Sequence, residues 1–452
     1  MEGNENKDNN VPSSKDKLLL KVCFCFFGIA TLLFFNAVLI NIDYFNKYQN
    51  TFFSTPSVIY PFLNFILNIV FQCYLICTKI KLSYKSLLLF TFIFQFCSVI
   101  IVPIIAICLK AHGRVSFILT GIIVFIQGLI CAICTFASLG LVSLFATEYI
   151  VALSIGQSIA GLTMNIFKFI VLLVFPNNSE RNETLGLIVF FIISALIMVM
   201  CVILLRALFK NEYFLSVLNN SNNDVSSSST ITTSVKSENK LSDSDNDNTD
   251  DNAMRNVDID KLEVDLINNN NKNEGAFAAF VYLFKQIKDI NILIFILYTI
   301  TFTIYPGACL IPDLFKMNTN YVAWKTNIIL TSFNTFDTIG REIVKYMTPK
   351  KLTYYILTYV RFIFLILVPL AVYLNHNNHD ILTNIILIFN VPMIAFTSGV
   401  ATSLGFALAP LNVDNNLKSK AGGSVAFFNI LGIFCGSCLA FAMEQINNYI
   451  QS

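Results

Sequence analysis

The sequence predicts an all-α, polytopic membrane protein with eleven transmembrane helices. Of its 452 residues, 55% are hydrophobic and 13% are charged, which is about half the charged fraction of an average soluble domain. Long stretches without charge recur along the chain, and a backbone inside lipid must form helices because lipid offers no hydrogen-bond partner. One long hydrophilic segment separates six of these stretches from the other five. These observations disfavour a soluble enzyme, a DNA-binding protein and a secreted disulfide scaffold.

Nine stretches are free of charge and long enough to span a membrane as helices. A hydrocarbon core about 30 Å thick takes roughly 20 helical residues. The nine stretches are residues 22–42, 51–78, 86–109, 115–147, 149–167, 184–205, 290–312, 381–413 and 421–443. Two further apolar stretches, residues 326–347 and 352–375, are interrupted by charge. We expect the fourth span to end just before Glu148, and Pro306 to kink the seventh span because proline removes a backbone hydrogen bond.

The distribution of Lys and Arg predicts a cytoplasmic N-terminus and an outer C-terminus. With that orientation, the short inner segments carry sixteen Lys and Arg residues and the outer loops carry six, in line with the usual excess of positive charge on the cytoplasmic side. Residues 1–17 then form a cytoplasmic tail, and residues 444–452 form a short outer tail. The first apolar run is long enough to stay in the membrane, so no cleavable signal peptide is expected. We expect an integral, multi-pass protein of the plasma membrane or of an intracellular organelle membrane.

Residues 207–287 are predicted to form a disordered, acidic cytoplasmic loop. This loop separates an N-terminal six-helix half, residues 18–206, from a C-terminal five-helix half, residues 288–443. Residues 211–274 include 13 acidic and 5 basic residues, and this Asn-, Ser- and Asp-rich segment buries too little apolar surface to offset the entropy of ordering. The formal net charge of +2 therefore combines an acidic loop with a basic remainder.

The sequence lacks the common motifs of enzymes and of ATP-driven transport. It contains no GxxxxGK[ST], GxSxG or HExxH sequence, and each of these motifs supplies specific catalytic or phosphate-binding groups. Cys131 and Cys134, like Cys435 and Cys438, have CxxC spacing but lie inside apolar spans without further ligands, so we interpret them as packing residues. The sequence therefore predicts that the protein is not an enzyme and binds no cofactor, no metal and no nucleic acid.

Charged residues in the middle of the eighth predicted span are the strongest functional signal. Asp337 and Arg341 lie four residues apart, with Asn334 on the same helix face. Each ionised group at mid-bilayer costs about 2.5 to 3.5 kcal/mol on insertion scales, and the acid-before-base spacing of four favours an ion pair. Two interpretations stay open: an internal pair that fixes helix packing, or a polar site or gate that lines a permeation path.

Other polar residues recur inside the predicted spans. Amides both donate and accept hydrogen bonds, which suits a neutral polar solute better than an inorganic ion, although a lone amide also serves as a contact between helices. These residues are Asn64, Asn68 and Gln72, spaced every four residues in the second span, together with Asn36, Gln157, Lys168 and Arg361.

Several short motifs occur in order along the spans. Residues 31–36 read TLLFFN, 156–161 GQSIAG, 302–306 FTIYP, 333–341 FNTFDTIGR, 361–364 RFIF, 398–410 SGVATSLGFALAP and 421–437 AGGSVAFFNILGIFCGS. In these motifs, in eleven spans and in a long loop after the sixth span, the chain resembles the equilibrative nucleoside transporter family. The stretch FNxFDxxGR is the most specific. The Asn and Lys bias of the loops is typical of an AT-rich genome and favours a protozoan member.

The resemblance implies a pseudo-symmetric bundle of six and five helices that carries nucleosides or nucleobases, purines above all, by alternating access. It assigns substrate recognition to Asn334, Asp337 and Arg341, where a carboxylate beside a guanidinium matches the hydroxyls of a ribose. Phe35 and Tyr305 are expected to flank the base, and Asn36, next to Phe35, is expected to contact the substrate as well. The family's first-span PWN is present as Phe-Phe-Asn, ending at Asn36.

Two further departures from the family pattern are Ser398, where the family commonly has Asn, and Thr135, where many members have a polar amide. These changes bear on base selectivity more than on transport itself.

The mode of transport and two other functions stay open at this point. Transport is expected to be facilitative or proton-coupled, with protons as a partner in the second case and Asp337 as the titrating group. One alternative is a major-facilitator-type carrier of another small polar solute, which would usually have twelve spans. The other is a non-transporting membrane receptor or scaffold that works through its acidic loop.

Overall fold

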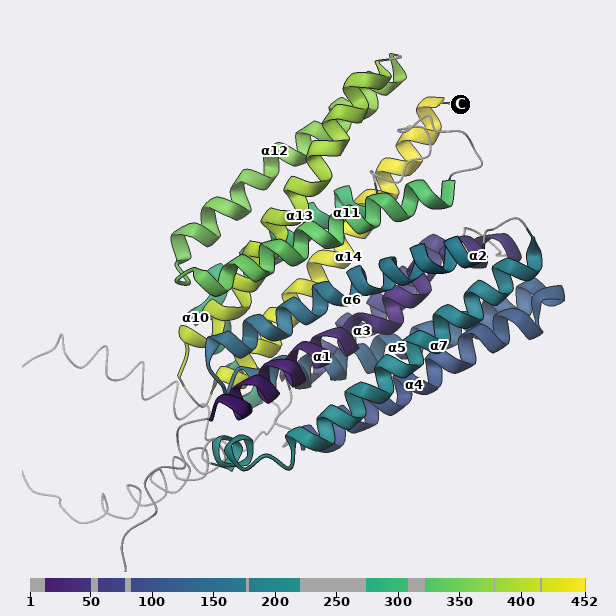
Figure 1. The fold of residues 1–452 in the computed structure, drawn as a ribbon. Coiled ribbons are helices and arrows are strands. Elements are labelled where there is room, and N and C mark those ends of the chain that lie inside the picture. Colours follow the sequence, from purple (N-terminus) through teal and green to yellow (C-terminus); the bar gives the residue numbers. More distant parts are fainter. Residues whose placement is uncertain are drawn as a thin grey trace, which may run out of the picture.

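A computed structural model describes residues 13–49, 56–77, 83–175, 179–219, 274–307, 322–377, 379–414 and 417–451. Long helices run side by side as one elongated bundle (Figure 1). Within the described ranges, eleven helices have 22 or more residues, and nine helical segments are both long and apolar enough to cross a membrane. The prediction of an all-α, polytopic membrane protein is therefore confirmed.

The first six long helices follow the predicted spans closely. Their bounds are α1 (Ser14–Ile40), α3 (Pro56–Cys77), α4 (Tyr84–Cys108), α5 (Gly113–Val142), α6 (Thr147–Val174) and α7 (Glu180–Leu208), with a short α2 (Ile42–Tyr48) and the 3-10 turn η1 (Lys110–His112) between them. Ser13 caps α1 by accepting a hydrogen bond from the Asp16 backbone N–H at 3.2 Å. The fourth long helix ends at Val142, a few residues earlier than expected, and Glu148 lies in the first turn of α6.

Five more long helices follow. Their bounds are α10 (Glu274–Phe302), α11 (Val322–Ile343), α12 (Lys351–His376), α13 (Asp380–Leu411) and α14 (Lys418–Gln451), with the 3-10 turn η6 (Val344–Tyr346) after α11. The π-helical turn η2 (Thr303–Gly307) extends α10, and its Tyr305 is extended at φ −125° and ψ 130°. This break confirms the predicted kink, because a residue that precedes a proline is driven out of the helical region.

The helices continue further than the charge-free runs suggested. The predicted tail 1–17 becomes helical at Ser14, the predicted loop 207–287 is helical over residues 212–219 and from Glu274 onward, and α14 extends through most of 444–452. Outside lipid, a helix tolerates charge and keeps its own hydrogen-bond ladder, so the absence of charge marks the span and not the end of the helix. Residues 1–12 and 220–273 lie outside the described residues.

The two groups of helices pack in corresponding ways. In the first group, α1 packs against α6, and α5 packs against α3 and α4; in the second, α10 packs against α14, and α13 packs against α11 and α12. The groups meet where α6 contacts α11 and α13, and where α14 contacts α3 and α5. Each of these contacts has a counterpart in the other group, so the packing follows a pseudo-two-fold relation. Among the described helices of the second group, none corresponds to α7.

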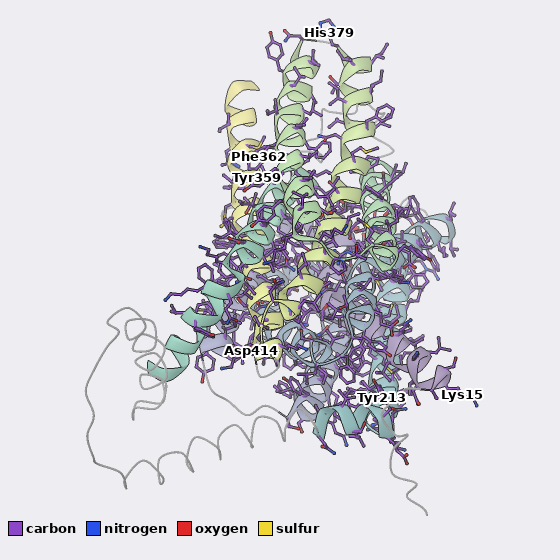
Figure 2. All side chains as sticks on the ribbon, turned by 90° about the vertical axis from the view of Figure 1, so that its left-hand side faces the viewer. Lys15, Tyr213, Tyr359, Phe362, His379 and Asp414 are labelled. Atoms are coloured by element: carbon purple, nitrogen blue, oxygen red, sulfur yellow. The ribbon has the colours of Figure 1, made fainter. Side chains whose placement is uncertain are left out.

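Each end of the bundle is marked by the turns between helices. Lys15, Tyr213 and Asp414 lie at one end, and His379 lies at the opposite end (Figure 2). We call the first the loop end, because residues 143–146 and 412–414 connect helices there, and the opposite one the far end.

Candidate functional site

A cavity lies between the two halves, and all six residues predicted to bind substrate line it. Its walls come from α1, α3, α5 and α6 of the first half and from α10, η2, α11, α13 and α14 of the second. The six predicted residues are Phe35, Asn36, Tyr305, Asn334, Asp337 and Arg341. Helices far apart in the sequence thus bring the predicted residues to one place.

Asp337 and Arg341 form the predicted pair, and the pair is buried. The Arg341 Nε donates to Asp337 Oδ2 at 2.9 Å, and the two side chains are only 7% and 6% exposed. Asp337 Oδ1 is also buried, and it has no hydrogen-bond partner among the described residues. An ionised oxygen without a partner is costly away from water. One carboxylate oxygen of Asp337 therefore binds Arg341, and the other is an unused acceptor in a residue that lines the cavity.

Asn334 packs closely against the opposite half. A Cβ atom at Gly161 of α6 would lie 2.7 Å from both polar atoms of the Asn334 side chain, so glycine is what makes room for this amide. One turn away, the hydroxyl oxygens of Ser158 and Thr338 lie 2.6 Å apart. The polar face of α11 thus runs along α6, at the contact between the two halves.

Aromatic side chains enclose the cavity from both halves. The rings of Tyr305 and Phe333 stack with centroids 3.6 Å apart, and those of Phe35 and Phe65 have centroids 5.1 Å apart. All four line the cavity. Aromatic rings prefer offset-stacked or tilted contacts with other π-systems, so these two pairs are the surfaces that a flat heteroaromatic solute would meet.

The second span contributes amides at the position that corresponds to the ion pair. A Cβ atom at Gly128 of α5 would lie 2.2 Å from the Asn64 carbonyl oxygen, just as one at Gly399 of α13 would lie 2.1 Å from that of Asp337. Asn64 and Asn68 in α3 therefore occupy the places that Asp337 and Arg341 occupy in α11. Both amides line the cavity, which thus has an uncharged polar wall opposite a charged one.

Three of the predicted polar residues, Gln72, Lys168 and Arg361, do not line the cavity. Gln72 donates to Asn68 Oδ1 at 3.0 Å, and Lys168 donates to Asn41 Oδ1 at 3.0 Å. Arg361 is fully buried in α12. Its Nη1 donates to the Ile394 carbonyl and to Thr397 Oγ1, both at 2.9 Å.

The second Arg361 nitrogen, Nη2, donates to Thr301 Oγ1, and Thr301 lines the cavity. Arg361 therefore joins α12 to α10 and α13 and supports the cavity from behind. Gln157, the remaining predicted residue, lines the cavity itself.

Replacing Arg361 with lysine is expected to weaken this support. Lysine keeps the charge but lacks the planar fork that reaches two helices at once, and each lost charge-assisted hydrogen bond is worth about 1.5 to 3 kcal/mol. The melting temperature of the detergent-solubilised protein should fall by several degrees. Lys351→Arg, at an exposed position, is the control and should leave the melting temperature unchanged. Equal melting temperatures of wild type, Arg361→Lys and Lys351→Arg would contradict the supporting role of Arg361.

Sequence reasoning passed over several polar residues that line the cavity, among them Thr301, Asn165, Asn429, Tyr298 and Ser158. Both polar atoms of the Asn165 amide and the Oδ1 of Asn429 are buried and have no hydrogen-bond partner among the described residues. Tyr298 Oη accepts a hydrogen bond from Thr402 at 3.2 Å, and Ser158 lies beside Thr338 as described above. An amide in an otherwise apolar span was the available signal for the two asparagines. Nothing in the sequence pattern distinguishes the tyrosine from its many apolar neighbours.

Comparisons with known proteins agree with this geometry. A family model described as "Nucleoside transporter" matches residues 120–445. The chain is 22% identical to equilibrative nucleotide transporter 7 of Arabidopsis thaliana, over 96% of this chain and 97% of that protein.

Among solved structures, the chain is similar to the major facilitator superfamily proton:xylose symporter XylE, with a TM-score of 0.62 and 12% identity over 96% of this chain and 90% of that one. It is also similar to the major facilitator superfamily transporter FucP in its outward conformation, with a TM-score of 0.53 and 13% identity over 96% and 98%. The fold is therefore like that of the major facilitator superfamily.

Proposed function

This chain belongs to the nucleoside transporter family, and on that basis we propose that it carries nucleosides or nucleobases, purines above all, across a membrane by alternating access. The family is one of transporters and not of enzymes. The observation that carries the proposal is the buried ion pair of Asp337 and Arg341 in the wall of a cavity between two pseudo-symmetric halves. A pair needed only for helix packing has no reason to lie at that cavity.

The chemistry of the cavity supports a nucleoside in particular. A ribose presents neighbouring hydroxyls, which donate well to a carboxylate oxygen and accept from a guanidinium. Asp337 Oδ1 is an acceptor without a partner among the described residues, and Asn334 and Asn36 are further polar groups of the cavity wall. Phe35 with Phe65, and Tyr305 with Phe333, provide flat aromatic surfaces for the base. Asn64, Asn68 and Gln157 supply donors and acceptors for the polar edge of the base.

The fold bears on the two alternative functions. A major-facilitator-type carrier usually has twelve spans, and this number was expected to distinguish it from a nucleoside carrier. This chain, however, combines a major-facilitator-like fold with membership of the nucleoside transporter family. The two descriptions concern architecture and substrate, respectively, and do not compete. Alternating access uses a cavity between two corresponding halves, whereas a scaffold that works through its acidic loop does not need one.

Uptake of labelled adenosine into liposomes that contain the purified protein tests the proposal. We expect saturable uptake that unlabelled nucleosides or nucleobases compete away, and no saturable uptake of any of them would overturn it. A pH gradient distinguishes the two modes of transport. Facilitative transport reaches the same internal concentration with and without the gradient, whereas proton symport accumulates solute when the outside is acidic, with Asp337 as the group that exchanges the proton.

Deleting residues 225–271 from the acidic loop is expected to leave uptake within about twofold of wild type, because a Ser-, Asn- and Asp-rich segment of this kind behaves as a tether. These residues lie outside the described ranges. Uptake per inserted protein, compared between the full chain and the deletion variant, is the measurement. Abolished uptake in the deletion variant would contradict this role and would show that transport itself needs the loop.

A further inference from the structure

Arg341 connects the two halves of the bundle as well as pairing with Asp337. Its Nη1 donates to the backbone carbonyl oxygen of Ser154 at 2.8 Å and to the Ser154 hydroxyl at 2.9 Å. The same hydroxyl lies 2.8 Å from the hydroxyl oxygen of Ser403 on α13. Ser154 belongs to α6 of the first half, whereas Asp337, Arg341 and Ser403 belong to the second. One guanidinium therefore ties the charged wall of the cavity to a helix of the opposite half.

This contact lies toward the loop end of the bundle, where α6 begins and α11 ends. The halves also touch there through the hydroxyl oxygens of Tyr84 on α4 and Ser419 on α14, which are 2.6 Å apart. A Cβ atom at Gly422 of α14 would lie 2.8 Å from the Leu139 carbonyl oxygen of α5, so these two helices pack with their backbones nearly in contact. At the loop end the two halves are therefore closed against each other.

A continuous row of contacts runs from Arg341 along the cavity wall, between the same two helices. Successive turns of α11 meet α6 at Ser154 through Arg341, at Ser158 through Thr338, and at Gly161 through Asn334. Figure 1 shows α6 and α11 running beside each other over this length. A shift of α11 at the cavity therefore also moves the contact at the loop end.

We propose that the hydrogen bonds from Arg341 to Ser154 act as a latch that keeps the cavity closed at the loop end, and that solute bound at Asp337 and Arg341 loosens it. Opening that end requires α6 and α11 to separate. The buried Arg341 guanidinium then loses its two hydrogen-bond acceptors on Ser154. A buried charged donor needs a replacement acceptor, and a hydroxyl of the solute is one. Only the second part of the proposal, control by solute, rests on the proposed function.

Hydrogen–deuterium exchange of the full-length protein in detergent, without solute, tests the latch. Ser154→Ala removes one of the two acceptors and is expected to raise exchange about tenfold in segments 143–147 and 417–424, because the loss of one charge-assisted hydrogen bond shifts the equilibrium toward the open form. Ser194→Ala is the matched control. The Ser194 side chain is equally buried, but it donates to the Phe190 carbonyl at 3.0 Å within the first half, so exchange at the loop end should match wild type.

Two results would overturn the latch: unchanged exchange in Ser154→Ala, or an equal rise at far-end segments 109–113 and 379–383, which would mean general loosening. Ser403→Ala provides a second variant and is expected to give a smaller rise at the loop end only. Adding adenosine to the wild-type protein should raise exchange in the same segments, and adding it to Asp337→Asn should not. If adenosine is transported but leaves exchange unchanged, control by solute is wrong. If no nucleoside is transported, the comparison of Ser154→Ala with Ser194→Ala still decides whether the latch exists.

Discussion

Replacing Asp337 with alanine is expected to abolish uptake while the protein still inserts into the membrane, and Arg341→Ala is expected to do the same. Each change removes a group proposed to bind the solute and leaves the other charge buried without its partner, which costs about 3 to 5 kcal/mol. A loss of that size corresponds to about a 100-fold or larger reduction in rate if it falls on the solute-bound state. The measurement is the initial rate of adenosine uptake per inserted protein.

A neighbouring ion pair on the same segment of the chain provides the matched control. Glu342 and Lys345 are 44% and 42% exposed and form a salt bridge at the loop end. Because an exposed pair contributes about 0 to 1 kcal/mol, Glu342→Ala and Lys345→Ala should keep uptake within about twofold. A double variant, Asp337→Asn with Arg341→Gln, separates the two interpretations of the buried pair. Normal uptake by this variant would show that the pair serves helix packing alone.

Replacing Gly399 with alanine is expected to have the second-largest effect, although Gly399 belongs to α13 and carries no functional group. Its Cβ atom would lie 2.1 Å from the Asp337 carbonyl oxygen and 3.0 Å from the Arg341 nitrogen. Both are backbone atoms, so α11 must move as a whole and take the ion pair with it. Overpacking of this kind costs about 1 to 3 kcal/mol or more. We expect a lower melting temperature in detergent and about a tenfold or larger loss of uptake.

Gly121→Ala is the control for this substitution. A Cβ atom at Gly121 would have its nearest contact with the Leu63 side chain at 3.5 Å, which is an ordinary van der Waals distance. Alanine is also a better helix former than glycine, by about 1 kcal/mol. Uptake and melting temperature should therefore equal or exceed those of wild type. Similar values for Gly121→Ala and Gly399→Ala would show that the contact between α11 and α13 does not position the pair.

The sequence was sufficient to place the helices but not their ends. The absence of charge marks the length of helix in lipid, but it placed the end of the fourth span just before Glu148, whereas α5 ends at Val142. The charge-free run underestimated the length of α10. This helix begins at Glu274 and not near Ile290, because Lys285, Lys288 and Asp289 interrupt the apolar run. Orientation across the membrane stays a prediction, since it depends on Lys and Arg counts alone.

The candidate site was predictable to the extent that it consists of polar residues in apolar spans. Spacing along one helix predicted that Asp337 and Arg341 would pair, and the structure brings them together. Contacts between helices are different, because no local pattern records them. Ser154 is one small polar residue among many, and only the packing of α6 on α11 shows that it accepts from Arg341. Arg361 is a similar case, since its charge inside an apolar span marked it as a candidate but did not predict its three hydrogen bonds to α10 and α13.

The central claim is that this cavity binds a nucleoside through Asp337, and direct binding tests it most closely. Isothermal titration of adenosine into the purified, detergent-solubilised protein should give saturable binding to wild type. Asp337→Asn keeps the size of the side chain but removes its charge, and should weaken the affinity about tenfold or more, as expected for the loss of a charge-assisted hydrogen bond. Equal affinity of both proteins, or no binding of any nucleoside or nucleobase to wild type, would contradict the account.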